Sequence, residues 1–227
     1  MKSSVITFPG SNCDRDMDVA LKKFGFINKM VWHDDSDLPK SDLVVLPGGF
    51  SYGDYLRCGS MASKSKIMRS VINFANSGGL VMGICNGFQI LVETGLVPGV
   101  LLRNKYLEFI CKNVFIKIEN KDNPYFKNLD KKVLELHIAH NEGNYFCTNE
   151  QLKEIEDNNQ VAIFYSNKDG NIEEKFNPNG SLKNIAGIFN KEKNVLGMMP
   201  HPERMIDRNL SGEDGSLFFK NLINNIK

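Results

Sequence analysis

The chain has 227 residues, of which 41% are hydrophobic and 24% charged, and its formal net charge is +1. A chain of this length can bury a hydrophobic core without disulfide or metal cross-links. Its near-neutral charge argues against a nucleic-acid-binding or membrane-surface protein. Its five cysteines form no C-x-x-C pair, which indicates a reducing compartment and no metal site of the zinc type. We expect a cytoplasmic protein, because no apolar run resembles a signal peptide or reaches the roughly 18 residues of a membrane span.

The first half of the chain alternates short apolar runs with helical patterns. Strands are predicted over residues 4–8, 29–33, 43–47 and 80–84, and helices over 13–24, 60–76 and 86–93, the first of them with Asn12 as its N-cap. Continuous apolar strands that alternate with helices are typical of an α/β fold with a parallel sheet covered on both faces.

The second half is richer in strands and in turn signals such as NKDG and NPNG. Strand-like segments at 113–119, 133–140, 161–166, 185–189 and 195–201 predict an insertion of antiparallel strands into the α/β frame. A last helix is expected at 215–226, with Leu217, Phe218, Leu222 and Ile226 as its core stripe. No linker or repeat interrupts the chain, so residues 1–227 are predicted to form a single domain.

A cysteine stands where one predicted strand passes directly into a helix. The sequence Gly83-Ile84-Cys85-Asn86-Gly87 has the form G-x-C-x-G, which is typical of a nucleophile elbow with cysteine in place of serine. Side chains at the two glycines would strike the neighbouring strand and helix. The turn is expected to push the sulfur up at the carboxyl edge of the sheet, where open α/β folds bind ligands, and the helix N-terminus favours its thiolate. Cys13, Cys58, Cys111 and Cys147 are expected to be buried structural residues.

A thiol nucleophile needs a base and a group that orients the base. In the segment MMPHPERM, His201 follows an apolar strand and Glu203 lies two residues further on, so both can face one cleft. The predicted catalytic triad is therefore Cys85, His201 and Glu203, with the carboxylate selecting the tautomer of the imidazole. Without the elbow, a surface histidine beside a solvated glutamate would be the simpler interpretation.

An oxyanion hole is predicted beside the elbow. The loop LPGGFSYGD leaves strand 43–47 at the same edge of the sheet, and its glycines allow the backbone to turn N–H groups inward. We assign the donors to the backbone of Gly49 and Phe50 and to the N–H of Asn86, the residue after the nucleophile. Alone, the two glycines would indicate only a turn.

Phosphate loops of the form G-x-x-x-x-G-K-[ST], G-x-G-x-x-G fingerprints and H-E-x-x-H helices are missing from the sequence. We therefore expect no cofactor and no metal on this chain. Any ATP chemistry linked to its function is expected on another chain.

The motif GICNGFQ with a distant HPE resembles the class I, triad-type glutamine amidotransferases. Six ordered blocks are similar to the glutaminase subunits of phosphoribosylformylglycinamidine synthase: FPGSNCDRD, LPGGFSYGDYLRCG, GICNGFQIL, RNKYLEFICK, AHNEGNYF and GMMPHPER. The resemblance implies a flavodoxin-like open parallel sheet with helices on both faces and an antiparallel strand insertion. It differs at Asn141, where the family usually has glycine, and asparagine tolerates a glycine-like backbone angle.

The resemblance also implies a reaction. Cys85 would attack the side-chain amide of glutamine, His201 would protonate the departing ammonia, and water would release glutamate. Gln89 would lie in the glutamine pocket, with further contacts from residues 103–109. The ammonia would pass to a large ATP-dependent synthetase subunit, which carries ATP and Mg and is joined in many bacteria by a small third subunit. That complex would convert formylglycinamide ribonucleotide to formylglycinamidine ribonucleotide in de novo purine (IMP) biosynthesis.

Two other functions remain open at this stage. A free-standing cysteine hydrolase acting on γ-glutamyl peptides or other amides would use the same elbow and triad. A non-catalytic binding module with Cys85 as a redox sensor would share the fold, because fold does not determine function. Ammonia released into neutral water becomes mostly ammonium, which is no nucleophile, so the chemistry favours an enzyme that works with a partner.

Overall fold

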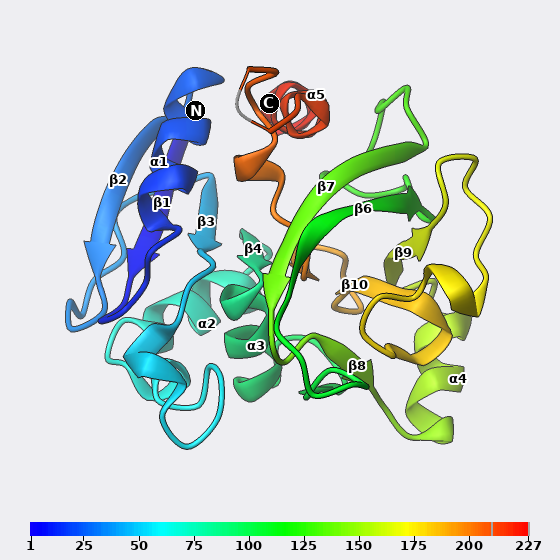
Figure 1. Cartoon of the computed structure of the whole chain (residues 1–227). Coiled ribbons are helices and arrows are strands. Elements are labelled where there is room, and N and C mark those ends of the chain that lie inside the picture. The colour runs from blue at the N-terminus through cyan, green and yellow to red at the C-terminus, as the bar shows by residue number, and fades with distance from the viewer. Residues whose placement is uncertain (210, 227) are drawn as a thin grey trace.

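A nine-stranded sheet runs through the computed structural model, which describes residues 1–209 and 211–226 (Figure 1). Five neighbouring strands are parallel, in the order β2 (Ile27–Trp32), β1 (Lys2–Thr7), β3 (Leu43–Leu46), β4 (Leu80–Ile84) and β11 (Val195–Met198). The sheet continues through antiparallel pairs of β10 (Ile185–Phe189), β9 (Val161–Ser166), β6 (Ile110–Ile118) and β7 (Val133–His140). These four strands come between β4 and β11 in the chain, so the predicted α/β sheet with an antiparallel insertion is confirmed.

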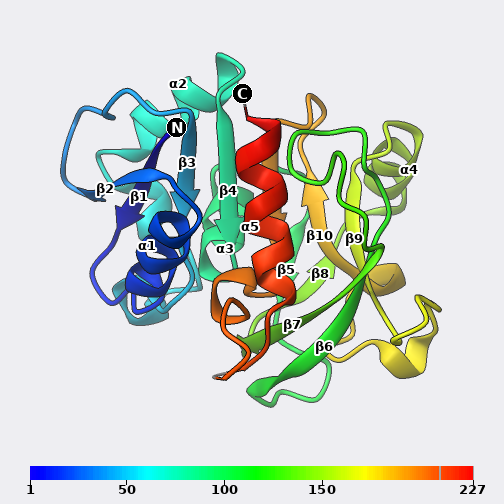
Figure 2. The same cartoon turned by 90° about the horizontal axis from the view of Figure 1, so that it is seen from above.

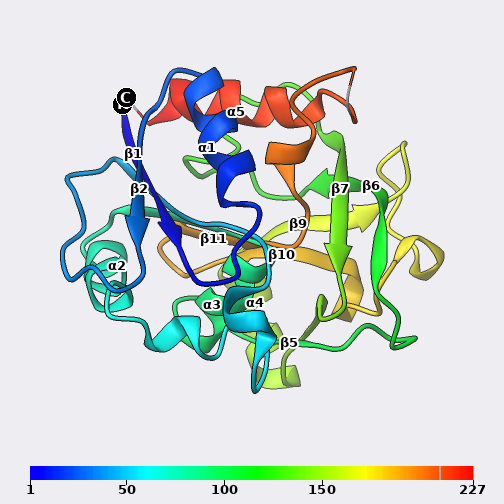
Figure 3. The ribbon, with the colours of Figure 1, turned by 60° about the vertical axis from the view of Figure 1, so that its left-hand side comes forward.

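Helices cover both faces of this sheet. Figure 3 shows α1 (Asp14–Lys23) and α5 (Asp214–Asn225) on one face and α2 (Met68–Asn76) and α3 (Asn86–Glu93) on the other. Seen from above, α5 passes in front of the middle of the sheet, where the parallel strands meet the antiparallel ones (Figure 2). None of the helices in the described part of the chain is long and apolar enough to cross a membrane.

Several predicted helix details are wrong. The helix expected over 60–76 is a short 3-10 turn, Ala62–Lys64, followed by α2, because Ser65 is extended between them. The N-cap of α1 is Cys13 rather than Asn12, and it makes no side-chain capping bond. In α5, Leu217 is 37% exposed, whereas its neighbours Phe218 and Phe219 are fully buried.

Three elements were not predicted. Strands β5 (Val100–Leu102) and β8 (Asn144–Phe146) pair in a small second sheet, and each is too short to show a period. Helix α4 (Asn149–Asp157) begins with a capping box formed by Thr148 and Gln151. The T-x-x-Q pattern of that box is visible in the sequence and is a recognised helix start. Further 3-10 turns lie at Ser51–Asp54, Glu174–Phe176, Leu182–Asn184 and Pro202–Arg204.

The loop between β6 and β7 packs against the amino ends of the central strands of the sheet. Tyr125 in this loop is fully buried, and its hydroxyl lies 2.8 Å from the carbonyl oxygen of Val81 and 2.7 Å from that of Asn194. One hydroxyl therefore joins the loop to the starts of β4 and β11.

We expect Tyr125→Phe to lower the free energy of unfolding by about 1 kcal/mol, because it removes a buried hydrogen bond without changing the shape of the ring. The midpoint of urea unfolding measures the loss. Tyr106→Phe is the matched control, because Tyr106 is 69% exposed. Equal midpoints for the two variants would contradict this role for the hydroxyl.

Candidate active site

The loops that follow β1, β3, β4 and β11 meet at one edge of the sheet. Gly48, after β3, lies so close to two of them that a Cβ there would be 2.6 Å from His201 Cε1 and 3.3 Å from Cys13 Sγ. This is the carboxyl edge of the parallel strands, where open α/β sheets bind their ligands.

Cys85 occupies a sharp turn between β4 and α3. Its φ of 50° and ψ of −104° are strained for a residue with a side chain. The turn is held by a hydrogen bond from Cys85 N–H to the Met198 carbonyl, 2.8 Å long. A Cβ on Gly87 would lie 1.9 Å from the Leu46 carbonyl oxygen, and one on Gly83 would lie 2.6 Å from that of Gly87. The predicted geometry of the elbow, and the need for both glycines, are confirmed.

His201 and Glu203 form a buried pair at the end of β11. His201 Nδ1 lies 2.6 Å from Glu203 Oε1, and the two residues are 1% and 2% exposed. His201 also donates its backbone N–H to the His137 carbonyl on the edge strand β7, at 2.8 Å. With Nδ1 engaged by the carboxylate, Nε2 is the ring nitrogen that can exchange a proton with a thiol. It has no hydrogen-bond partner within the described residues.

Burial and two neighbouring groups determine the charge of the imidazole. Burial alone would lower the pKa of His201, but the Glu203 carboxylate and the nearby Cys85 sulfur raise this pKa to about 10. The imidazolium is therefore the favoured form at neutral pH, and it is the form that can protonate a leaving ammonia. Cys85 itself is 5% exposed, and its sulfur lies 3.7 Å from the Ala139 carbonyl oxygen.

The predicted oxyanion donors differ in orientation. Gly49 has a φ of 126°, and a Cβ there would lie 2.6 Å from Asn12 N. Its N–H makes no hydrogen bond in the part of the chain that the structure describes. The Asn86 N–H belongs to the first turn of α3 and so lacks an intrahelical partner. By contrast, Phe50 donates its N–H to the Gly10 carbonyl at 3.4 Å, so the structure leaves Gly49 and Asn86 as the two available donors.

Gln89 lies one helical turn after Cys85 and is 6% exposed. Its Oε1 accepts from Asn86 Nδ2 at 2.9 Å, and its Nε2 donates to the Glu142 carbonyl at 2.7 Å. An amide has two N–H groups and two acceptor lone pairs, so one of each remains for a ligand.

Asn104 attaches residues 103–109 to the loop after β7. This residue is 1% exposed, and its Oδ1 accepts from Gly143 N–H and from His140 Nδ1, both at 3.1 Å. Burial and the nearby His201 lower the pKa of His140 to about 3, so this ring stays neutral. Asn141 does not have a positive φ, so the glycine-like backbone angle considered for it is not used.

Two residues, Cys13 and Arg204, lie beside the triad, and the sequence did not predict this position for either of them. Cys13 is buried as expected, but its sulfur and ligand atoms of His201 and Glu203 all lie within 4.8 Å of one another. Arg204 Nη2 donates to this sulfur at 3.0 Å. Burial and the Glu203 charge raise the pKa of Cys13 to about 12, so it remains a thiol. These side chains could offer ligand atoms to a metal ion, and the expectation of no metal stays a prediction.

The other three cysteines differ in exposure. Cys147 is buried and Cys58 partly buried, whereas Cys111 is exposed, so the expectation of burial is wrong for Cys111. Its sulfur lies 3.5 Å from His137 Nε2.

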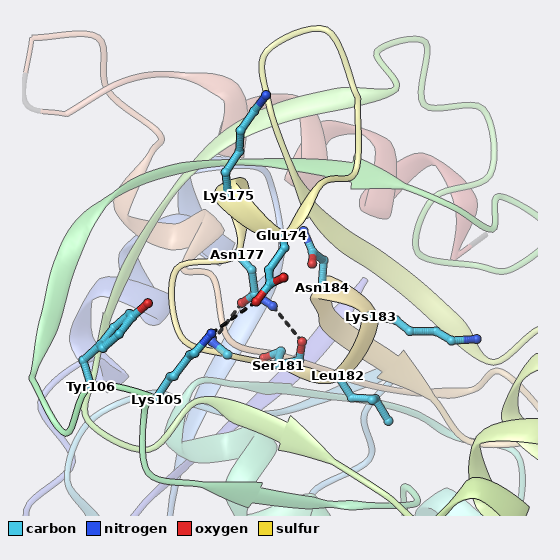
Figure 4. A pocket seen from close by; sticks show the side chains of 10 residues that line it. Lys105, Tyr106, Glu174, Lys175, Asn177, Ser181, Leu182, Lys183 and Asn184 are labelled. Atoms are coloured by element: carbon cyan, nitrogen blue, oxygen red, sulfur yellow. Dashed lines mark hydrogen bonds and ion pairs between the residues drawn. The ribbon is translucent and has the colours of Figure 1, made fainter.

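A surface pocket of about 670 Å³ lies between residues 105–106 and 174–184 (Figure 4). Its three lysines face carboxylates: Lys105 pairs with Glu174 at 3.2 Å, Lys175 pairs with Glu173 at 2.8 Å, and Lys183 pairs with Glu156. The pocket therefore carries no free group of cations for an anion, and the triad does not line it.

Residues 1–212 match the CobB/CobQ-like glutamine amidotransferase domain family. The chain is also 81% identical over 227 residues, 100% of both sequences, to the phosphoribosylformylglycinamidine synthase subunit PurQ of Pelagibacter ubique. The chain belongs to the PurQ family of glutamine amidotransferases. The PurQ subunit of Gloeobacter violaceus is 50% identical over 227 residues, which cover 98% of this chain and 97% of that subunit. A chain of PurLQS from Thermotoga maritima superposes with a TM-score of 0.87 at 41% identity, over 100% of this chain and 99% of that one.

Glu203→Gln tests the electrostatics of the pair. The variant removes the negative charge but keeps the size of the side chain, so burial then lowers the pKa of His201 without opposition from the carboxylate. We expect the alkaline limb of the glutaminase pH profile to shift to lower pH, and kcat to fall by roughly 10²–10⁴-fold. Glutamine hydrolysis measured across a pH series gives both quantities.

The control is Glu213→Gln, whose side chain is 59% exposed. An alkaline limb that stays in place in Glu203→Gln would show that this carboxylate does not tune the base.

Proposed function

We propose that this chain is the glutaminase subunit of phosphoribosylformylglycinamidine synthase. It hydrolyses glutamine to glutamate and ammonia and passes the ammonia to an ATP-dependent synthetase, which converts formylglycinamide ribonucleotide to formylglycinamidine ribonucleotide in purine biosynthesis. The observation that carries the proposal is the buried His201–Glu203 pair at the same sheet edge as the strained Cys85 elbow, in a chain 81% identical to a PurQ subunit along its whole length.

The geometry suggests how each residue acts. Cys85 Sγ attacks the carboxamide carbon of glutamine, and Gly49 and Asn86 donate their backbone N–H groups to the oxyanion that forms. His201 gives the proton on Nε2 to the departing ammonia. It then takes a proton from the water that hydrolyses the γ-glutamyl thioester and regenerates the Cys85 thiolate. Glu203 holds the ring in the tautomer that this exchange needs.

Gln89 remains our candidate for a direct contact with glutamine, through the N–H and the lone pair that its internal hydrogen bonds leave free. Residues 103–109, which Asn104 attaches to the wall of the site, are the second candidate.

The partners follow from the family and from the chemistry of ammonia. One of the solved relatives is a chain of PurLQS. We propose that the present chain likewise works with a large synthetase subunit and a small third subunit, in the cytoplasm. ATP and Mg would be bound by the synthetase, and no cofactor by this chain, which we take to be one domain over residues 1–227. A free-standing hydrolase is not favoured, because the relatives are synthase subunits along their whole length.

A glutamine-shaped electrophile should label Cys85 and spare the other four cysteines, because only Cys85 combines the elbow with a nearby imidazolium. Peptide mapping by mass spectrometry measures the label. Cys111 is the internal control, since it is exposed and beside a histidine but lies within strand β6 and not at an elbow. Even labelling of all five cysteines would count against the assigned nucleophile.

Coupling to the synthetase gives a second expectation. We expect the isolated chain to hydrolyse glutamine slowly and the reconstituted complex with its nucleotide substrate to do so faster, because ammonia is useful only when an acceptor is present. Glutamate release measured with and without the partner subunits tests this. An isolated chain that already runs at the rate of the complex would remove the coupling.

A further inference from the structure

Two buried side-chain amides in α3 join this helix to two loops of the candidate active site. Ser51 donates its backbone N–H to Asn86 Oδ1 at 3.2 Å, and Asn86 Nδ2 donates to Gln89 Oε1 at 2.9 Å. Gln89 Nε2 then donates to the Glu142 carbonyl at 2.7 Å. This amide relay connects the loop after β3, the first turn of α3 and the loop after β7, and its central residue Asn86 has no exposed surface.

The two ends of the amide relay determine its direction. The Ser51 N–H can only donate and the Glu142 carbonyl can only accept. Each amide must therefore present its oxygen toward Ser51 and its nitrogen toward Glu142. Turning either amide over would bring two donors or two acceptors together in a buried place, and each unsatisfied group would cost about 1–3 kcal/mol. The backbone thus allows only one orientation of Asn86 and Gln89.

The amide relay bears on the oxyanion hole because the two available donors belong to different segments. Gly49 N–H comes from the loop after β3, and Asn86 N–H comes from the start of α3. An oxyanion hole works when its donors lie about 2.7–3.1 Å from one developing charge. Ser51 is two residues from Gly49, so its bond to the Asn86 side chain ties the first donor segment to the second.

We infer that the amide relay sets the spacing of the oxyanion donors, and that the side chain of Asn86 is a positioning residue for glutamine hydrolysis. This inference rests on the proposed function. The backbone N–H of Asn86 would touch the oxyanion, whereas its carboxamide acts only through Ser51 and Gln89. Removing the carboxamide therefore weakens stabilisation of the transition state more than it weakens glutamine binding, because Gln89 keeps its hydrogen bond to the Glu142 carbonyl.

Asn86→Leu tests the positioning role. It keeps the backbone N–H and approximately the side-chain volume, adds no charge, and removes both hydrogen bonds. We expect kcat to fall roughly 10–100-fold and KM to rise by a clearly smaller factor, because a displacement of about 1 Å in a donor is enough for such a loss of kcat, whereas Gln89 keeps its bond to the Glu142 carbonyl. Steady-state glutaminase kinetics of the reconstituted complex measures both constants.

Asn194→Leu is the matched control. Asn194 is also buried and also donates through its carboxamide, to the carbonyls of Ala75 and Gly79 at 2.8 Å, but it precedes β11 at the far end of the strands from Cys85. It should lower the urea midpoint and leave kcat in place. An equal loss of kcat in both variants would indicate general loosening and overturn the inference.

Asn86→Asp supplies a second readout if the leucine variant does not fold. The ionised carboxylate of this variant could only accept and would repel Gln89 Oε1, which is also an acceptor. The protonated acid could again donate a hydrogen bond to Gln89 Oε1. We expect the ratio of variant to wild-type kcat to rise as the pH is lowered. A ratio that does not change with pH, or a raised KM with normal kcat, would overturn the positioning role. A wild-type complex without glutaminase activity would instead refute the proposed function itself.

Discussion

The close packing of α3 against β3 is the contact on which the rest of the site depends. The Gly87 backbone approaches the Leu46 carbonyl so closely that any side chain would collide with it, and this approach holds Cys85 in its strained turn. Such backbone strain costs on the order of 1–3 kcal/mol and persists only where the surroundings determine the conformation. Here the surroundings are two fully buried strands and the hydrogen bond from Cys85 to Met198, so the stable sheet supports the strained nucleophile.

The antiparallel part of the sheet shields the active-site residues that the parallel part brings together. The parallel strands alone would bring Cys85, Gly49 and His201 to one edge, but His201 would be open to water on one side. The edge strand β7 closes that side, because its His137 carbonyl accepts the His201 N–H and its Ala139 carbonyl lies beside the Cys85 sulfur. Burial strengthens the effect of Glu203 on the imidazole, since charges interact more strongly away from water. The inserted strands therefore contribute to catalysis, because they bury the imidazole that Glu203 acts on.

The sequence predicted what depends on local pattern and missed what depends on distant contacts. The elbow could be recognised because two glycines, a strand and a helix are adjacent in the chain, and His201 and Glu203 because they share one short extended segment. The orientation of Phe50 could not be predicted, because its N–H is engaged by Gly10, which lies forty residues away. Cys13 was placed in the core correctly, yet nothing local to it indicated that Arg204 and Glu203 would pack beside it.

The burial of the site also suits the transfer of its product, ammonia, to a partner subunit. Cys85 and His201 are almost inaccessible to solvent, so ammonia leaves the tetrahedral intermediate in an environment with little water to protonate it. The same closure limits the entry of glutamine and places the loops around the site under mutual constraint, through Asn104 and the Asn86–Gln89 pair. A site built this way gains little from hydrolysis alone and most from a partner that receives ammonia directly. The tight coupling of its loops is therefore a physical reason for the enzyme to work as one subunit of a larger synthase.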